Sequence, residues 1–200
     1  MPFFDWLEQS TLSMWIKESL SLWPYDILCL STHAVGMAVL VGFSSAVALR
    51  VLGVAPGVPL APMKPFFPVM YAGFWINALS GAGLFITYPV KAVTNPIFYL
   101  KMAGVVAAVV CIRRIKRQVF DALDRAPDRA NDALAAGRGR QSAAALLLVW
   151  AVTITAGRLL AYKGIPAIEW VTAIGMTALT AVTAAVGYRF TRMRAPQARA

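Results

Sequence analysis

Hydrophobic positions in this chain fall into five long blocks separated by short polar or charged segments. A membrane hydrocarbon core roughly 30 Å thick is crossed by about 20 helical residues. An α-helix is stable there because it forms its backbone hydrogen bonds within itself. Each block is long enough for one crossing and is bounded by proline, glycine or charge. The pattern predicts an all-α integral membrane bundle of five transmembrane helices, at 25–52, 66–88, 97–116, 143–162 and 168–189.

Composition and charge agree with a membrane protein. Of the 200 residues, 59% are hydrophobic and 14% are charged, and the formal net charge is +10. No basic patch is interleaved with exposed aromatic residues, so the charge does not indicate nucleic-acid binding. The predicted partners are the lipid bilayer and either other membrane subunits or further copies of the chain.

Lysines and arginines are unevenly distributed among the predicted connections. Short cytoplasmic loops of membrane proteins retain these residues. Fourteen of the 19 lie in the first connection, the third connection and the C-terminal segment, whereas Lys17, Lys91, Lys101, Arg158 and Lys163 lie elsewhere. With five crossings the two sets fall on opposite sides of the membrane. This predicts an N-terminus outside and a C-terminus in the cytoplasm.

Residues 1–24 predict a helix that lies in the outer interface of the membrane. They begin without a basic segment and contain Asp5, Glu8 and Glu18, which is unlike a signal peptide. Apolar residues and tryptophans along one helix are typical of interfacial segments. These residues are Phe3, Phe4, Trp6, Leu7, Met14, Trp15, Leu22 and Trp23. Packing of the helix on a partner protein is the alternative.

The connection between the third and fourth spans is the one clearly polar stretch. Its acids at 121, 124, 128 and 132 alternate with Arg125 and Arg129, which predicts i,i+4 pairing in a helix that continues from the third span. Glycines at 137 and 139 predict a loop after that helix. Residues 117–142 are therefore expected to form a cytoplasmic hairpin within a transmembrane domain of residues 25–190, followed by a basic tail at 191–200.

The single histidine, His33, is the first candidate for chemistry because it lies roughly 14 Å into the first span. Cys29, His33 and Met37 follow at intervals of four and share one helix face. Thiol, imidazole and thioether groups suit Cu(I), and His and Met also ligate haem iron. Because Cys29 and Met37 are about 12 Å apart along a straight helix, one ion would take at most two of the three. The other reading is a packed histidine hydrogen-bonded to another helix.

Other polar groups gather near the outer ends of the spans. Lys101 and Arg158 lie about one turn inside the third and fourth spans, and Asp26 and Glu169 begin the first and fifth. In a structural interpretation the two cations reach the interface or pair with the carboxylates. In a functional interpretation they line an outward-facing pocket around His33 and hold an anionic group, such as a haem propionate, a lipid phosphate or a substrate carboxylate.

Asn77 lies midway along the second span, among small residues. Small residues let membrane helices approach closely, and a side-chain amide can hydrogen-bond across the interface. We therefore expect Asn77 to be a structural donor between helices. The small residues are Gly73, Ser80, Gly81 and Gly83.

Several short motifs together carry a resemblance to a known family. They are His33-Ala-Val-Gly36, Leu49-Arg-Val-Leu-Gly53, the glycine-rich second span and Asn95-Pro-Ile-Phe-Tyr-Leu-Lys101. Over residues 25–118 the chain resembles a family of uncharacterised bacterial inner-membrane proteins that is distantly similar to the copper-resistance D-type membrane proteins and their haem-binding relatives. The resemblance implies a small helical bundle in the bacterial inner (plasma) membrane, with a periplasmic N-terminus, and a link to haem b or copper.

The chain departs from those haem-binding relatives, which place histidines on more than one helix. One histidine excludes bis-histidine haem within a single chain. Haem would need His33 with a methionine, or a site shared across a dimer. The candidate methionines are Met70, Met102 and Met176.

Two functional hypotheses follow, and an enzyme is the less favoured class. The sequence contains no Walker-type loop, no H-E-x-x-H, no G-x-S-x-G and no paired carboxylates inside the spans. The first hypothesis is a non-catalytic accessory or anchor subunit of a membrane complex. The second is a haem- or copper-binding protein of electron transfer or metal handling, with His33 as ligand and Lys101 and Arg158 holding the anionic groups of the cofactor.

Overall fold

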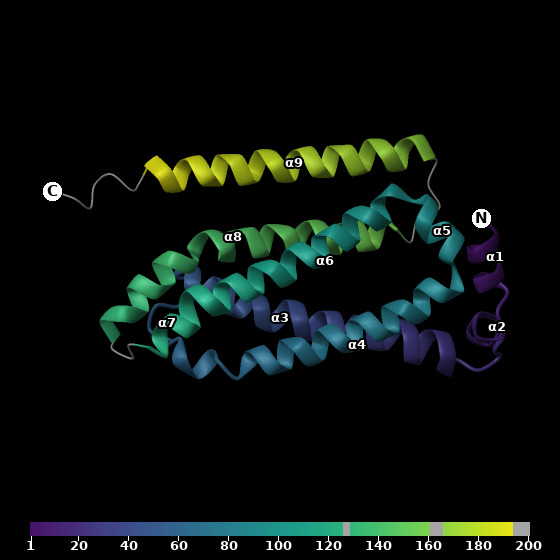
Figure 1. Ribbon diagram of the computed structural model, residues 1–200, viewed down its shortest axis with the longest axis horizontal. Coiled ribbons are helices and arrows are strands. Elements are labelled where there is room, and N and C mark those ends of the chain that lie inside the picture. The colour runs from purple at the N-terminus through teal and green to yellow at the C-terminus, as the bar shows by residue number, and fades with distance from the viewer. Residues whose placement is uncertain (126–128, 161–165, 194–200) are drawn as a thin grey trace. The chain divides into compact units, whose positions relative to one another are not determined.

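The computed structural model describes residues 1–125, 129–160 and 166–193, and it describes side chains in 1–125, 137–160, 170–183 and 185. All regular structure in this part of the chain is helical (Figure 1). The helices group into two units, Met1–Arg50 with Ala55–Asn95, and Val51–Val54 with Pro96–Ala200. The all-α membrane fold expected from the hydrophobic pattern is confirmed.

Within the described residues, four helices are long and apolar enough to cross a membrane. They are Trp23–Leu52, Ala61–Thr87, Pro96–Leu123 and Gly137–Leu159. The fifth predicted span falls on α9 (Pro166–Met193), a continuous helix of 28 residues. Its apolar stretch in the described side chains, Trp170–Thr183, is shorter than a full crossing. The structure therefore shows four candidate spans, and a fifth crossing by α9 stays a prediction.

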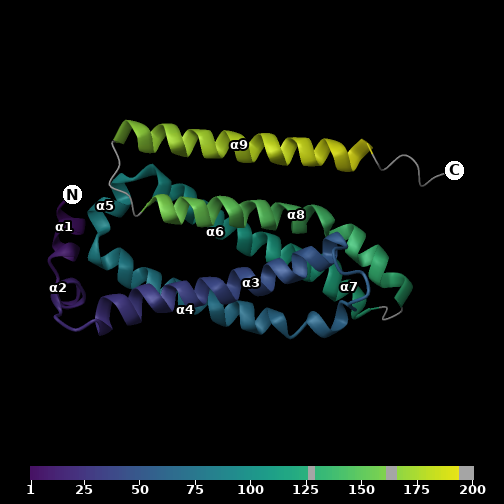
Figure 2. The ribbon, with the colours of Figure 1, turned by 180° about the vertical axis from the view of Figure 1, so that it is seen from behind.

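In the first unit, the first two spans form an antiparallel pair. The π-helical segment η1 (Trp23–Ser31) continues without a break into α3 (Thr32–Leu52), which lies beside α4 (Phe66–Thr87) (Figure 2). A Cβ built on Gly36 of α3 would lie 2.6 Å from the backbone nitrogen of Asn77 and 2.9 Å from the carbonyl oxygen of Gly73. The two helix backbones touch there, which only a residue without a side chain permits.

The connection between these two spans begins with a glycine and is held by an arginine. Gly53, directly after α3, has a φ of +94°, the left-handed conformation that commonly ends a helix. Arg50 donates from Nε to the carbonyl oxygen of Val58 and from Nη2 to that of Pro56, the latter over 3.3 Å. The short 3₁₀ turn η2 (Ala61–Met63) then leads into α4.

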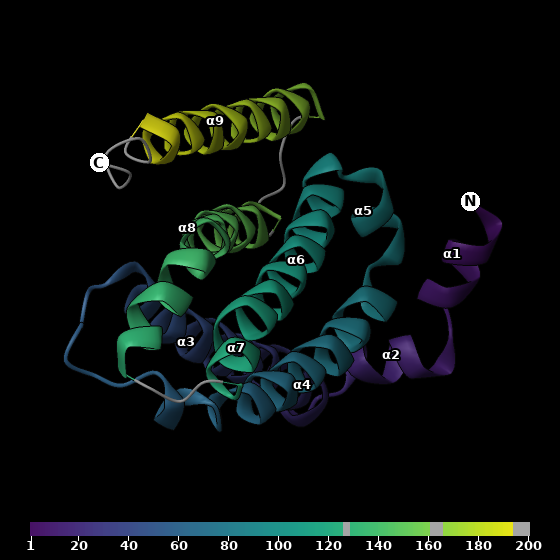
Figure 3. The same ribbon diagram turned by 60° about the vertical axis from the view of Figure 1, so that its left-hand side comes forward.

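The N-terminal segment is two helices, and the prediction of one continuous helix over it is wrong. α1 (Pro2–Glu8) ends at Gln9, and Ser10 caps α2 (Thr11–Glu18) by accepting a hydrogen bond from the Ser13 backbone N–H over 3.3 Å. A serine cap satisfies an otherwise unpaired amide and favours a new helix start at that point. α1 lies against the short helix α5 (Pro89–Thr94), and α2 lies against α4 (Figure 3).

In the second unit, α6 (Pro96–Ile115) and α8 (Arg129–Leu159) lie side by side along most of their lengths (Figure 1). Gly104 of α6 lies against the Thr153 side chain, and Gly139 of α8 lies against Val119. A small cluster of Ile97, Ala156 and Ala173 joins both helices to α9. Close approach at glycines thus recurs in both units.

The predicted loop at residues 137–139 is wrong, because α8 runs through it as helix from Arg129. α6 continues through the π-helical segment η3 (Lys116–Phe120) and α7 (Asp121–Leu123), and the chain turns at Asp124 and Arg125. A Cβ on Gly139 would lie 2.5 Å from Cγ2 of Val119. Gly139 therefore allows close packing of two helices. The sequence alone does not distinguish such a glycine from one that ends a helix.

Candidate functional site

His33 and Asn77 join α3 to α4 through a reciprocal pair of hydrogen bonds. His33 Nδ1 lies 3.0 Å from the backbone carbonyl oxygen of Asn77, and Asn77 Nδ2 donates to the backbone carbonyl oxygen of His33 over 2.9 Å. A carbonyl oxygen can only accept, so Nδ1 carries a proton in this contact. Each side chain thus binds the backbone of the opposite helix.

Ser80, one turn along α4 from Asn77, completes this arrangement. Its hydroxyl lies 3.3 Å from His33 Nδ1 and donates to the carbonyl oxygen of Ile76 over 2.6 Å. Ser80 is buried, whereas His33 is partly exposed. Sequence analysis noted Ser80 only as a small residue. Ser80 follows Asn77 by three residues, so both lie on one face of α4. This spacing is the sequence signal that could have identified Ser80 as a second contact of the imidazole.

Two glycines of α4 make room for the side chains of Cys29 and His33. A Cβ on Gly83 would lie 2.7 Å from Cys29 Sγ, and one on Gly81 would lie 3.0 Å from His33 Cε1. The thiol and the imidazole therefore both face α4. Cys29 is only 6% exposed, so its sulfur is enclosed by protein in this unit.

The π-helical start of the first span affects how these groups line up. In η1 the helix is wider than an α-helix, and the hydroxyls of Ser31 and Thr32 donate to carbonyl oxygens five residues earlier, over 2.7 and 2.8 Å. Cys29 lies inside this segment, whereas His33 and Met37 lie in regular α3. π-Helical turns are frequent near functional sites and change which residues share a face.

The described side chains supply no additional His, Cys, Asp or Glu ligand beside Cys29 and His33. Among the side chains that the structure describes, no group of three His, Cys, Asp or Glu residues is placed to hold a metal ion. Met37, one turn beyond His33, is partly exposed. Met70 is buried but lies seven residues from Asn77 along α4, roughly 10 Å by helix rise, and so is remote from His33. Met102 and Met176 belong to the second unit.

The predicted outer cations Lys101 and Arg158 belong to the second unit, whereas His33 belongs to the first. In the second unit, the Lys101 side chain lies along Gly157, where a Cβ would be 3.6 Å from Cε and 3.9 Å from Nζ. Arg158, the next residue, is exposed. Asp26 is an exposed residue of the first unit, and the Glu169 side chain lies outside the described residues. Pairing of Arg158 with either carboxylate stays a prediction.

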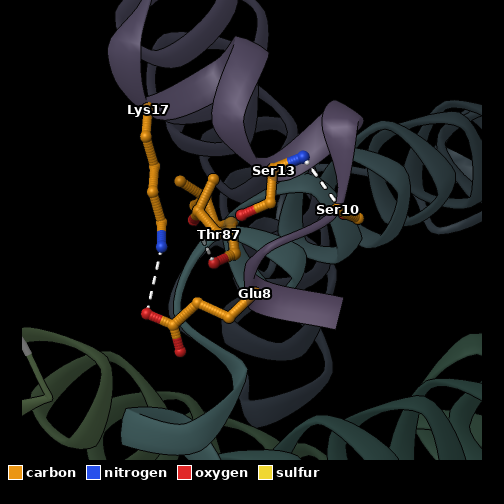
Figure 4. A network of polar contacts seen from close by, with 6 residues as sticks. Glu8, Ser10, Ser13, Lys17 and Thr87 are labelled. Atoms are coloured by element: carbon orange, nitrogen blue, oxygen red, sulfur yellow. Dashed lines mark hydrogen bonds and ion pairs between the residues drawn. The ribbon is translucent and has the colours of Figure 1, made fainter. Parts of the chain in front are cut away.

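The structure adds a polar cluster that sequence analysis missed, where α2 meets the end of α4 (Figure 4). Lys17 Nζ donates to Glu8 Oε1 over 3.0 Å and lies 4.7 Å from the centre of the Tyr88 ring. Ser13 and Thr87 are fully buried beside it. Because Glu8 and Lys17 are nine residues apart on different helices, only the turn at Ser10 brings them together.

Comparison of the chain with protein-family models, with curated proteins and with solved structures gives no match. The geometry of the chain itself is therefore the basis for its functional assignment.

Proposed function

We propose that this chain is a non-catalytic accessory or anchor subunit of a complex in the bacterial inner membrane. The observation that carries the proposal is the reciprocal bonding of His33 and Asn77 at a backbone contact between α3 and α4. Polar side chains inside a membrane are costly unless they are paired, and pairing them across two helices fixes the helices against each other. The bonding of His33 and Asn77 thus supports a structural role for these polar groups.

The outer surfaces of the spans are suited to lipid and to other subunits. Only 17% of the apolar window of Ala61–Thr87 is buried inside the structure. Large apolar side chains on this helix, among them Trp75 at 61% and Leu79 at 70% exposure, face outward. A small chain with this much unburied apolar surface can associate laterally without losing its own helix contacts.

The uneven positive charge supports the orientation with the N-terminus in the periplasm and the C-terminus in the cytoplasm. In that orientation α9 is the fifth crossing. We expect a reporter fused after Ala200 and a reporter inserted at 128–132 both to be active in the cytoplasm. If α9 does not cross, the two reporters will give opposite results, because only the fourth span then lies between residues 128–132 and the C-terminus. A periplasmic result at 128–132 would reject the orientation itself.

Haem or copper binding at His33 is the second candidate, and the contact of Nδ1 with a backbone carbonyl favours it. An Nδ1–H donated to a backbone carbonyl orients many metal-binding histidines and directs the lone pair of Nε2 to the metal. Cys29 faces the same helix. Lys101 and Arg158 would hold the anionic groups of the cofactor. This reading agrees with the resemblance to the copper-resistance D-type proteins, which is itself a proposal.

A reduced-minus-oxidised absorption spectrum with metal analysis separates the two candidates. If the chain is an accessory subunit, we expect protein purified in mild detergent to be colourless and free of copper. In size-exclusion chromatography it should elute well above the mass of one chain. A haem Soret band or stoichiometric copper that is lost in His33→Ala but retained in Asn77→Ala would reject it in favour of the cofactor. Asn77→Ala is the matched control, because it removes the other hydrogen bond of the same pair.

A further inference from the structure

The last turns of α6 and the segment η3 have two chemically different faces. Ile112, Ile115 and Val119 are buried, at 4%, 1% and 0% exposure. Arg113 and Arg114 at the end of α6, and Arg117 in η3, are exposed. Because the buried face packs on α8, the arginines point away from the helix pair.

The start of α8 brings two more arginines to the same level. Gly139 contacts Val119, so the residues on either side of it lie within about one turn of η3. These neighbours, Arg138 and Arg140, are both exposed. We call the five residues the arginine surface; they are Arg113, Arg114, Arg117, Arg138 and Arg140.

The arginine surface lies where lipid headgroups are expected. The apolar part of α6 runs from Ile97 to Ile112, roughly 24 Å of helix, and Arg113 is the first residue beyond it. A hydrocarbon core of roughly 30 Å therefore ends close to this position. Guanidinium groups can extend from there to the phosphates, which they bind through two parallel N–H donors.

The arginine surface carries five positive charges, and none of its members forms an ion pair with a described residue. Asp121 and Asp124 are the described acids on the adjoining turns, and the side chains at 128 and 132 lie outside the described residues. Clustered arginines at the end of a membrane helix attract negatively charged lipid.

We propose that the arginine surface binds the phosphate headgroups of anionic phospholipids. The complementarity of charge and the position at the end of a span favour the membrane as the occupant over a soluble phosphate or a nucleic acid. The inference needs only that α6 and α8 cross the membrane, and it does not depend on the accessory role proposed above.

The test measures binding of phosphatidylglycerol and phosphatidylcholine to the full chain in detergent, by native mass spectrometry and by thermal shift. We expect phosphatidylglycerol to bind and to raise the melting temperature, and phosphatidylcholine to have no effect. Each arginine removed should weaken binding roughly fivefold, so Arg113→Gln/Arg117→Gln should weaken it about 25-fold. About 0.5 M salt should weaken wild-type binding as well.

Two control variants isolate the position and the charge. Lys91→Gln removes a positive charge from an exposed site of the other unit, in a connection predicted to be periplasmic, and should bind like the wild type. Arg113→Lys/Arg117→Lys keeps the charge and should retain most of the binding.

Three results would overturn the proposal. The first is unchanged phosphatidylglycerol binding in Arg113→Gln/Arg117→Gln with wild-type folding. The second is equal stabilisation by inorganic phosphate alone, which would assign a free anion. The third is arginine-dependent binding of a single-stranded oligonucleotide without any preference for phosphatidylglycerol, which would assign nucleic acid.

Discussion

Gly36→Ala is expected to lower the free energy of unfolding by about 3 kcal/mol. The added Cβ would lie 2.6 Å from the backbone nitrogen of Asn77, and backbone atoms of a packed helix cannot move aside without separating α3 from α4. Separation would also stretch the hydrogen bonds between His33 and Asn77, which bridge the helices one turn away. Equilibrium unfolding in mixed micelles, followed by circular dichroism, measures the change.

Gly42→Ala is the matched control on the same helix. A Cβ on Gly42 would meet nothing within 4 Å, and alanine stabilises an open helix position by roughly 0.5 to 1 kcal/mol relative to glycine. The two substitutions are chemically identical and are predicted to have opposite signs. Equal effects of Gly36→Ala and Gly42→Ala would show that α3 and α4 do not touch at Gly36.

His33→Ala and Asn77→Ala are each expected to cost about 1 kcal/mol, because each removes one hydrogen bond between α3 and α4. Each bond joins one side chain to the backbone of the other residue, so removing one side chain leaves the second bond in place. Because the two residues are in contact, the double-mutant cycle should show a modest coupling, of about 0.5 to 1 kcal/mol. Thr94→Ala, which removes an exposed bond to the Val90 carbonyl oxygen of its own helix, should have little effect.

A strong coupling between His33→Ala and Asn77→Ala would contradict this geometry. A coupling well above 1 kcal/mol would mean that the two side chains bind each other or a shared group, such as a cofactor. The double-mutant cycle therefore tests for a cofactor at His33 by measuring stability, independently of the absorption spectrum.

The hydrophobic pattern predicted the four candidate spans of the described residues, whereas it could not predict the local breaks. The first span was expected to start at residue 25 and the helix starts at Trp23, and the second was expected to end at 88 and α4 ends at Thr87. The turn at Gln9 and Ser10 depends on one serine cap, and the continuity of α8 through Gly137 and Gly139 depends on Val119 of another helix. Neither has a periodic pattern in the sequence.

The candidate site was predictable in part. A histidine and an asparagine inside apolar helices are costly in hydrocarbon, so both residues were identified as important from the sequence. That His33 would bind the backbone at Asn77, with Ser80 beside it, depends on the register between α3 and α4. Register is set by where Gly36 meets Gly73, a contact between residues 37 positions apart that composition does not specify.

The sequence by itself determined that the chain forms long apolar helices suited to cross a membrane, because in hydrocarbon such a helix satisfies its backbone hydrogen bonds whatever its neighbours are. Tertiary structure alone decided which glycines are contact points, which polar groups meet across helices, and that the arginines of α6 and α8 share one level. These features depend on how helices that are distant in the chain pack, and packing is fixed by the shapes of both surfaces together.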